Sequence, residues 1–564
     1  MTFSKGLLTL GVSIVSAIVY FLRVAYSNRA RIDELRKQGV AMPAGWSWWF
    51  GHLLVLNERL KTLPPDVNVY TAMHDLVEEH ADTEVFLMDL WPMFSPTLMI
   101  SGPELAHQVA LNNDLPKPKD QESSFRPIVG GPSLITANGE PWKFWKSLLT
   151  PGFSASHMLS LVPSLVDAMD TFCELLEEKV GKGAFSLDDM AMKLAMDVVT
   201  KTTLDVDLDN QRKEHDISRA LNTILNWHSF WDPRILLNPL RVPVQWYYDR
   251  VVRSFILREL HKRFNEMKNG RAAVGKNMDR SKKVKSVIAL ALDEYITTKH
   301  EQYKMRFENI RLDDNFARIA ANQIRLFIFA GNDTTATALV YTYHMLSQHP
   351  YVLAKMRDEH DSLFGTDTNA GDMLREKPAL INQTRYTLAV IKETLRLYPP
   401  ASSIRDGVLG ISLVDRKGTN IPTEGLSATI MHPYIHINPR LWIRPLEFLP
   451  ERWLVEPSHE LYPPIGAFRP FEQGSRSCIG QTLVLNEIRV ALVMTVRRFY
   501  IEPAYGEWDA AKKAKEGVFD TMLRGLGIKR DECKEVKGER AYQTSRSGAH
   551  PADRYPCRVS FLEK

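Results

Sequence analysis

One cysteine stands where its chemistry would be unusual, at the start of a predicted helix. The segment from Pro470 to Gly480 reads PFEQGSRSCIG, and an apolar-periodic stretch predicted to be helical follows Cys478 to about residue 499. A thiol at a helix N-terminus lies at the positive end of the helix dipole, which favours the thiolate form. Gly474 permits a tight turn with close backbone approach, and Arg476 offers a planar fork for a carboxylate.

Together these residues predict a socket for a flat ligand. Phe471 could cover one face of such a ligand, and the thiolate of Cys478 could bind a metal at the centre of an acid-bearing macrocycle. A lone cysteine is more often an inert buried residue. We apply that interpretation to Cys173, Cys533 and Cys557, which lack such surroundings and are predicted to be structural or surface thiols.

A group of polar residues lies within the longest predicted helix, residues 313–347. The sequence from Ala330 to Thr335 reads AGNDTT, and Gly331 is expected to interrupt the helix because glycine is a poor helix former. Asp333 and Thr334 stand in an otherwise apolar stretch. Two other interpretations stay open: a solvent-exposed turn, or a threonine that bonds back to the preceding turn and bends the helix.

Charged residues at helical spacing form a further feature. Glu393 and Arg396 lie three positions apart in an apolar-periodic helix that is predicted to end before Pro399. On this spacing alone they could be an exposed ion pair of little energetic weight. Trp142 and Lys146, four positions apart, share one face of another predicted helix.

The cysteine segment resembles a known signature. The pattern FxxGxRxCxG, from Phe471 to Gly480, is similar to the haem-binding motif of cytochromes P450, and the resemblance extends over residues 43–564 with further motifs in the family's order. It implies a mainly α fold with a small β region, in a single domain that binds haem b with the thiolate of Cys478 as the axial iron ligand. The resemblance assigns three further cofactor-binding residues: Phe471, Gly474 and Arg476.

The resemblance also gives roles to the charged residues. Glu393-x-x-Arg396 resembles the family's ExxR motif, which implies a network with Arg452 that stabilises the protein core around the haem. Removal of one member would leave a buried charge without a partner.

Two further stretches resemble parts of the family that contact the haem carboxylates. Trp142-x-x-x-Lys146 is similar to the WxxxR motif, although lysine stands where arginine is usual and lacks its bidentate geometry. Arg405, just after the Pro-Pro pair, is placed like a further carboxylate-binding arginine. Lys146 and Arg405 could instead be surface charges.

The polar group at 330–335 resembles the dioxygen-binding motif of the family's I helix. The resemblance implies room for dioxygen at a small residue, a hydrogen bond from Thr334 to the oxygen or to a water, and transfer of protons from solvent by Asp333. Asp333 and Thr334 are therefore the predicted catalytic residues.

These resemblances predict a haem-thiolate monooxygenase that inserts one oxygen atom from dioxygen into a hydrophobic small molecule. The sequence as a whole resembles the family's fungal enzymes of secondary metabolism, and this resemblance implies a polyketide or terpenoid substrate. Two alternatives remain: a haem-thiolate isomerase, dehydratase or peroxide-using enzyme, and a non-catalytic haem-binding protein.

Electrons are expected to come from another protein. The sequence has no GxGxxG motif in a βαβ context, no P-loop and no iron–sulfur cysteine cluster. The family resemblance implies NADPH–cytochrome P450 reductase as the partner, so that NADPH is used indirectly. A basic surface that could steer an acidic partner is predicted from five residues: Lys143, Lys146, Arg489, Arg497 and Arg498.

The N-terminus carries an uncharged run from Gly6 to Leu22. Its length is at the lower limit for a helix that spans a bilayer, and a cleaved signal peptide is the alternative. Positive residues after the run place the body in the cytosol. We therefore predict a single-pass protein of the endoplasmic reticulum membrane with three segments: an N-terminal transmembrane anchor at 1–28, a linker with a Pro/Gly hinge at 29–45, and a haem domain at 46–564.

The elements that must position these residues are mostly helical. Helical periodicity recurs at 161–176 and 313–347. Short strands are predicted at 84–88, 97–100, 411–414 and 558–561, and the charged segment 268–285 is predicted to be a solvated loop. Because no break in composition divides the chain after the anchor, one large domain is favoured over the several that its length suggests.

Composition excludes several classes of protein. The chain has 564 residues, with 71 Lys and Arg against 67 Asp and Glu, a net charge of +4. So weak a charge gives no reason to expect nucleic acid as a partner. A hydrophobic fraction of 44% and a charged fraction of 24% exclude a disordered, collagen-like or polytopic membrane protein. Four cysteines without a CxxC pair exclude a disulfide scaffold and a zinc ribbon.

Overall fold

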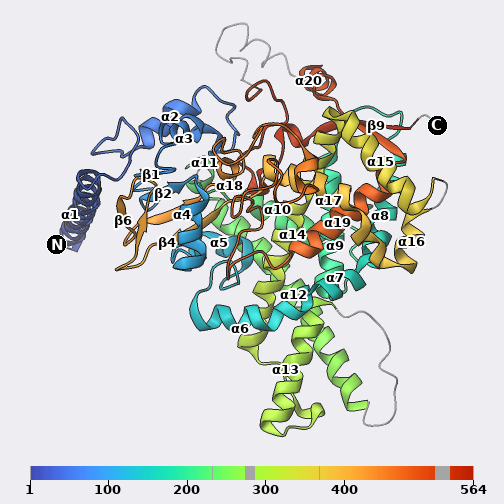
Figure 1. Cartoon of the computed structure of the whole chain (residues 1–564). Coiled ribbons are helices and arrows are strands. Elements are labelled where there is room, and N and C mark those ends of the chain that lie inside the picture. The colour runs from blue at the N-terminus through green and yellow to red at the C-terminus, as the bar shows by residue number, and fades with distance from the viewer. Residues whose placement is uncertain (1, 231–232, 274–285, 367–368, 515–533, 563–564) are drawn as a thin grey trace.

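The computed structural model describes residues 2–230, 233–273, 286–366, 369–514 and 534–562. They form a mainly helical body with a small β region, as the sequence predicts (Figure 1). The long helices that fill the centre and right of the view in Figure 1 are α8 (Val162–Glu177), α9 (Leu187–Leu204), α14 (Asp314–Gln348), α17 (Arg385–Leu397) and α19 (Gln481–Thr495).

The central helix of this body is α14. Its side chains are buried on all sides over most of its length, which is the pattern of a helix enclosed by others. Asp313 caps its N-terminus, since the side chain accepts a hydrogen bond of 2.9 Å from the backbone N–H of Phe316. The helix packs most extensively against α9, and α19 packs against α8. Residues in the middle of α14 therefore lie deep inside the molecule.

The β region consists of three small sheets. The largest has the order β1 (Val85–Met88), β2 (Thr97–Ile100), β7 (Ser427–Ile430), β4 (Ser403–Asp406), with β2 and β7 parallel and the other pairs antiparallel. The others are β3 (Phe185–Ser186), β9 (Pro556–Phe561), β8 (Phe499–Pro503), and the hairpin β5 (Ser412–Val414), β6 (Asn420–Pro422). The four strands predicted from sequence correspond to β1, β2, β5 and β9.

Shorter helices surround these elements, and short 3₁₀ or π turns carry the label η. Before α14 they are α2 (Leu53–Leu60), η1 (Thr71–Met73), α3 (His74–Glu79), α4 (Pro103–His107), η2 (Gln108–Asn112), α5 (Gln121–Val129), α6 (Gly139–Leu149), η3 (Thr150–Phe153), α7 (Ala155–Ser160), α10 (Asp216–Asn226), α11 (Pro233–Leu236), α12 (Arg241–Ala273), α13 (Val287–Tyr303) and η4 (Phe307–Asn309). After it come α15 (Pro350–Phe364), α16 (Ala370–Glu376), η5 (Pro378–Gln383), α18 (His432–Ile435), η6 (Pro450–Trp453), α20 (Tyr505–Ala514), η7 (Ser547–Ala549) and η8 (Ala552–Arg554). The ends of α12 and α13 project below the body in Figure 1.

Three expectations about these elements were wrong in detail. The helix after Cys478 ends at Thr495 and not near residue 499, because Phe499 begins strand β8, which pairs with β9. The segment predicted as a loop at 268–285 is helical to Ala273, the end of α12, and residues 274–285 lie outside the described residues. Gly331 does not interrupt α14, which is continuous from Asp314 to Gln348.

The N-terminal segment is one helix, α1 (Thr2–Lys37), at the left edge of Figure 1. Residues 29–37, predicted as part of a linker, form its last turns, and Ile32 and Leu35 are buried in the same cluster as residues of β1 and β2. The buried Arg29 forms an ion pair with Asp89 that fixes this end of the helix. The predicted transmembrane anchor is not confirmed: no helix in the described part of the chain has a stretch long and apolar enough to span a lipid bilayer.

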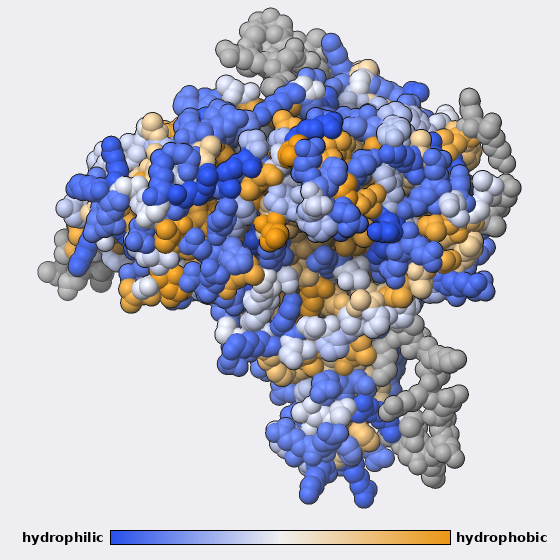
Figure 2. Space-filling model, in the orientation of Figure 1, coloured by the Kyte–Doolittle hydropathy of each residue, from blue (hydrophilic) through white to orange (hydrophobic). Residues whose placement is uncertain are grey.

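The surface of the body is typical of a globular protein. Figure 2 shows hydrophilic side chains over most of the visible face, with apolar side chains in small scattered groups. The functional site is therefore expected in the interior of the body.

Candidate functional site

The loop before α19 is closed by its own backbone. The N–H of Cys478 donates to the carbonyl of Phe471 at 2.8 Å, and the N–H of Ser477 donates to the carbonyl of Gly474 at 3.1 Å. Gly474 has φ +80°, and a Cβ added there would lie 2.6 Å from the carbonyl oxygen of Ala110. Only glycine fits this position without a shift of one of the two backbones. The loop thus holds the sulfur of Cys478 at the N-terminal end of α19.

Cys478 is exposed at the surface of the described protein, although enough protein lies around its thiol for burial to affect its protonation. Burial raises the pKa of the Cys478 thiol, whereas the backbone N–H groups of Gly480 and Gln481 and the charge of Lys146 act to lower it. A metal ion bound to the sulfur in place of the proton would neutralise the thiolate, so burial would no longer favour the protonated thiol. Cys173 and Cys557 are buried, as predicted for structural thiols, and Cys533 lies outside the described residues.

Arg476 lies against the aromatic face of Trp142. The guanidinium carbon is 3.9 Å from the ring centroid. The guanidinium donates to the carbonyl of Ala137 at 2.8 Å and to the side-chain oxygen of Asn138 at 2.9 Å, both at the start of α6. Burial and the neighbouring charge of Arg405 lower the pKa of Arg476 to about 10. Trp142 therefore positions Arg476, a contact that the sequence analysis did not foresee.

Two further cations lie close to Arg476. Arg405, on β4, is 1% exposed and donates to the hydroxyl of Ser403 at 2.5 Å and to the carbonyl of Ile404 at 3.0 Å. Its Nε has no hydrogen-bond partner among the described residues. Lys117 also donates to Ile404, at 3.3 Å, and its pKa is well below its usual value because of burial and then the charges of Arg405 and Arg476.

These three cations form a site for anions. We call Lys117, Arg405 and Arg476 the cationic cluster. Their mutual repulsion and the unpaired Nε of Arg405 indicate a missing acceptor of negative charge. The carboxylates of a haem group would supply such acceptors, and the exposed Cys478 would supply the iron ligand, so the residues present fit this cofactor. Lys117 was missed by the sequence analysis, because a lysine in a loop carries no motif.

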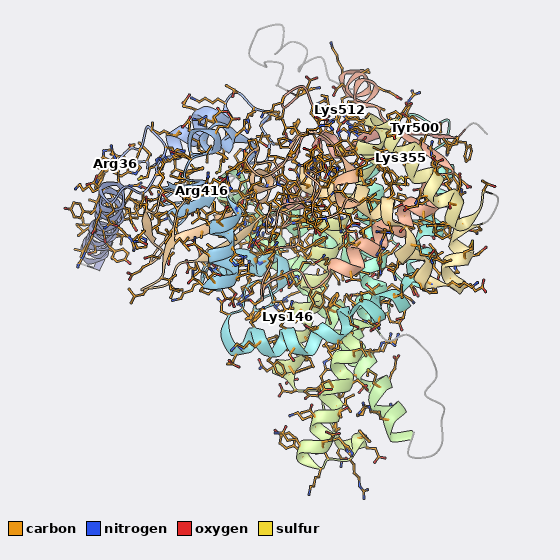
Figure 3. The ribbon with its side chains drawn as sticks, in the orientation of Figure 1. Arg36, Lys146, Lys355, Arg416, Tyr500 and Lys512 are labelled. Carbon is orange, nitrogen blue, oxygen red and sulfur yellow. The ribbon has the colours of Figure 1, made fainter. Side chains whose placement is uncertain are left out.

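Lys146 lies beside the cysteine loop and not in the cationic cluster. It projects from α6 on the underside of the body, as Figure 3 shows, and its amine donates to the carbonyl of Ser477 at 3.3 Å. Burial lowers the pKa of Lys146, and the negative form of Cys478 would raise it. Its position allows it to stabilise a thiolate at Cys478.

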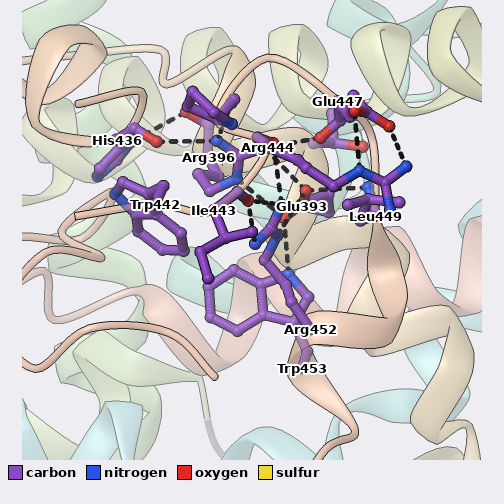
Figure 4. A network of polar contacts seen from close by, with 12 residues as sticks. Glu393, Arg396, His436, Trp442, Ile443, Arg444, Glu447, Leu449, Arg452 and Trp453 are labelled. Atoms are coloured by element: carbon purple, nitrogen blue, oxygen red, sulfur yellow. Dashed lines mark hydrogen bonds and ion pairs between the residues drawn. The ribbon is translucent and has the colours of Figure 1, made fainter. Parts of the chain in front are cut away.

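A buried ion network joins α17 to η6 (Figure 4). Glu393 Oε1 accepts hydrogen bonds from Arg396 Nη2 at 2.8 Å and from Arg452 Nε at 2.9 Å, and all three side chains are at most 1% exposed. Trp453 Nε1 donates to Glu393 Oε2 at 3.0 Å, and the backbone N–H of Leu449 donates to Oε1 at 3.0 Å. The carboxylate is therefore saturated, as a buried charge must be.

Arg396 extends the same network to the backbone. Its guanidinium donates to the carbonyls of His436 at 2.8 Å, Pro445 at 2.5 Å and Glu447 at 2.9 Å. These contacts join α17 to the irregular segment that leads to η6 and the cysteine loop.

The middle of α14 carries the predicted catalytic pair. The hydroxyl of Thr334 donates to the carbonyl of Ala330 at 2.7 Å, which is the back-bonded arrangement left open by the sequence. Asp333 is 3% exposed and lies 3.0 Å from the imidazole of His550. A Cβ on Gly331 would lie 2.8 Å from Val199 of α9, so close packing of the two helices explains this glycine. Because Asp333 is buried, protons from solvent would have to reach it through neighbouring groups, and its role in proton transfer stays a prediction.

The predicted basic surface is not formed by all five residues. Arg489 is 7% exposed and donates to the carbonyl of Ile381 at 3.0 Å and to Asn486 at 2.5 Å, so it belongs to the core. Arg497 and Arg498 form ion pairs with acidic side chains. The apolar periodicity of α19 could have indicated that Arg489 faces inward.

Comparisons with known proteins agree with this geometry. The family model described as Cytochrome P450 matches residues 42–520. The chain is 36% identical to "Cytochrome P450 monooxygenase polC" of Polytolypa hystricis, over 97% of this chain and 94% of the relative. It is 32% identical to "Cytochrome P450 monooxygenase acrF" of Aspergillus aculeatus, over 89% of this chain and 99% of that protein.

A solved structure shares the fold. The chain described as "Crystal structure of cytochrome P450DA heme domain" superposes with a TM-score of 0.64 at 19% identity, over 93% of this chain and 96% of the other. The similarity thus spans nearly the whole chain.

Proposed function

Since this chain belongs to the cytochrome P450 family and is a monooxygenase of that family, we propose that it inserts one atom of dioxygen into a hydrophobic small molecule by hydroxylation or a related oxidation. Proteins of this family bind haem b through a cysteine thiolate and use NADPH through a reductase. The observation that carries the proposal is the exposed Cys478 together with the cationic cluster, in which Arg405 is buried and Lys117 and Arg476 are partly buried.

Each part of the site has a proposed task. Cys478 holds the iron, and the haem supplies the activation of dioxygen when it is bound. The cationic cluster, with Trp142 behind Arg476, holds the haem carboxylates, and Lys146 stabilises the thiolate. Phe471 and Gly474 shape the loop, as their backbone bonds indicate.

The catalytic pair lies on the central helix. Thr334 can turn its hydroxyl from the carbonyl of Ala330 toward a bound oxygen or water, since the hydroxyl rotates freely about its bond to carbon. Asp333, one residue before, holds a carboxylate that can exchange protons with that water. Enzymes of this fold that do not activate dioxygen often lack this pair, so its presence favours the monooxygenase over an isomerase, dehydratase or peroxide-using enzyme.

An apolar cluster favours a hydrophobic substrate. Apolar side chains from α5, from the segment around the end of α10 and from α14 pack together next to Thr334; they include Phe125, Ile128, Leu225, Phe230, Phe329 and Ala330. A pocket of such side chains binds by burial of apolar surface. Together with the fungal relatives, it supports a polyketide or terpenoid of fungal secondary metabolism as the substrate.

The function is tested by its product and its electron donor. Extracts of strains with and without the gene are compared to find the accumulating metabolite, which is then incubated with the purified protein, NADPH, NADPH–cytochrome P450 reductase and ¹⁸O-labelled dioxygen. We expect one labelled oxygen atom in the product and NADPH consumption that tracks it. An isomerised or dehydrated product without label would support the first alternative, and ligand binding without turnover would support a non-catalytic protein.

We further propose that residues 1–28 attach the protein to the endoplasmic reticulum membrane as a single-pass anchor, with the body in the cytosol. Between Val12 and Leu22 the apolar side chains of α1 are 42–60% exposed, and Tyr20 is 71% exposed. Removal of residues 1–22 spares Arg29, Ile32 and Leu35, which are buried against the body. We expect this truncated protein to retain haem and to appear in the soluble fraction, whereas the full chain resists carbonate extraction from membranes; a truncated protein that stays in the membrane would contradict the anchor.

A further inference from the structure

Three polar side chains from distant parts of the sequence meet beside the middle of α14. His550, in the turn between η7 and η8, lies between Asp188 in the first turn of α9 and Asp333 on α14. Its Nδ1 is 2.6 Å from Asp188 Oδ1, and its Nε2 is 3.0 Å from Asp333 Oδ1. The exposed fractions of His550, Asp188 and Asp333 are 4%, 3% and 3%. The acid of the catalytic pair therefore has an imidazole as a hydrogen-bond partner.

The two carboxylates determine the charge of the imidazole. A neutral histidine has a single N–H and can donate to only one of them, whereas the imidazolium donates to both. Burial alone would lower the pKa of His550, but the charges and hydrogen bonds of Asp188 and Asp333 outweigh burial and raise the pKa of His550 to about 10. His550 is thus a cation at neutral pH, held between two anions.

Other charged groups lie near the turn. Arg554 forms an ion pair with Asp189 of α9. Burial and Arg554 lower the pKa of Arg546, while Asp188, Asp66 and Asp189 raise it. The charged groups that face His550 or its neighbours are thus Asp188, Asp189, Asp333, Arg546, Arg554 and Asp66. Of these, Asp188 and Asp333 hydrogen-bond to the imidazole ring.

The turn that carries His550 is built closely around Asp333. A Cβ on Gly548 would lie 2.6 Å from Asp333 Oδ2, so the glycine covers the second carboxylate oxygen. Gly548 has φ +72°, and the next residue, Ala549, has φ +55°, a strained value for a residue with a side chain. Thr544 holds the carbonyl of His550 with its backbone N–H at 2.9 Å and its hydroxyl at 2.7 Å. One oxygen of Asp333 is thus held by His550 and the other is covered by the turn.

We propose that His550 is a positioning residue for the oxidation: as a cation supported by Asp188, it fixes the carboxylate of Asp333 under the C-terminal turn in the orientation needed for proton transfer. The proposal rests on the proposed role of Asp333 in the monooxygenase reaction. It also predicts that deprotonation of His550 releases Asp333 and loosens the contact between α9, α14 and the C-terminal turn.

The first test is the pH dependence of stability, which needs no substrate. The urea unfolding of the haem-loaded protein is compared with that of His550→Gln from pH 6 to pH 9.5. A group whose pKa is higher in the folded protein than in the unfolded chain stabilises the folded state fully at pH values below its unfolded pKa, which is about 6.5 for histidine. This stabilisation is lost as the pH rises from the unfolded pKa to the folded pKa. We expect the unfolding constants of the two proteins to converge by about tenfold per pH unit above pH 6.5. A constant difference would overturn the proposal.

A matched control uses another buried histidine. His360 bonds to the hydroxyl of Thr387 at 2.7 Å, and burial and Arg497 lower the pKa of His360 to about 3. Because this imidazole is neutral in the folded protein and almost fully neutral in the unfolded chain above about pH 7.5, His360→Gln should differ from wild type by a nearly constant amount there. If His550→Gln does not fold, Asp188→Asn replaces it: with one carboxylate removed the folded pKa of His550 falls, so the loss of stability should still begin near pH 6.5 but should level off at a lower pH than in wild type. An unchanged pH profile would overturn the proposal.

The second test measures the fraction of the consumed NADPH whose electrons end in hydrogen peroxide. With purified reductase, NADPH and no added substrate at pH 7.5, we expect His550→Gln to divert a several-fold larger fraction of NADPH into hydrogen peroxide than wild type does. His550→Lys, which keeps the positive charge, should restore the fraction toward wild type. Equal fractions in the Gln and Lys variants, or in Gln and wild type, would overturn the positioning role. Absence of reductase-dependent NADPH oxidation in wild type would instead overturn the proposed function, and the role of Asp333 with it.

Discussion

Lys117 and Arg405 donate to the same carbonyl oxygen, that of Ile404, at 3.3 Å and 3.0 Å. Two cations that share one neutral acceptor repel each other, and burial strengthens this repulsion. The pKa of Lys117 lies well below its usual value for these reasons. The site therefore favours an anion, and a haem carboxylate is the anion that we propose for it.

Lys117 is accordingly expected to hold the cofactor. Lys117→Met should weaken haem retention by the loss of one charge-assisted hydrogen bond, about 1.5–3 kcal/mol, which corresponds to roughly a tenfold to hundredfold faster loss. The rate of haem transfer to excess apomyoglobin measures it. Lys119→Met is the matched control, because Lys119 is exposed in the same loop. Equal transfer rates in the two variants would remove Lys117 from the cofactor site.

Cys478 is expected to be the iron ligand. In Cys478→Ser the reduced, carbon monoxide-treated protein should lose the red-shifted absorption band that thiolate ligation produces, because an alcohol remains protonated at neutral pH. Cys173→Ala is the control: Cys173 is buried with its sulfur 3.7 Å from the carbonyl of Met494, and its loss should leave the band in place. A band that survives in Cys478→Ser but disappears in Cys173→Ala would reverse the assignment.

Gly474 tests the shape of the loop. Gly474→Ala introduces a Cβ 2.6 Å from the carbonyl oxygen of Ala110 at a residue with φ +80°. Gly410→Ala separates the two effects, since Gly410 has φ +81° and nothing within 4 Å of the added Cβ. We expect Gly410→Ala to lose only about 1–2 kcal/mol of stability with full haem content, and Gly474→Ala to yield protein with little haem. Similar haem content in both would show that the close contact with Ala110 is unimportant; absorbance per protein measures it.

Glu393 tests the buried network. Glu393→Gln leaves the guanidinium groups of Arg396 and Arg452 without their counter-charge, which is expected to destabilise by about 3–5 kcal/mol. The same substitution at Glu447 removes an exposed partner of Arg444, whose side chains are 52% and 53% exposed, and should change the urea midpoint little. A Glu393→Gln protein as stable as Glu447→Gln would mean that the network does not stabilise the fold.

Local sequence signals predict much of the candidate site. Cys478 could be identified because its surroundings, a glycine turn and a helix start, lie within one short segment and act over short distances. The pairing of Glu393 with Arg396 follows from helical periodicity. The same local reasoning failed where neighbours in space decide. Gly331 breaks no helix, because it packs on Val199, and Arg489 of α19 is buried where it donates to the carbonyl of Ile381.

The sequence by itself determined the family and the mainly helical fold, and it singled out the cysteine that we propose as the iron ligand, since each depends on patterns within a few turns of chain. Only the tertiary structure decided that Lys117 joins Arg405 and that His550 bridges Asp188 and Asp333, 362 and 217 positions away. The physical reason is that burial and charge act through space: a lysine or histidine in a loop has no distinguishing neighbours along the chain, and acquires its chemistry from carboxylates and cations that the fold brings to it.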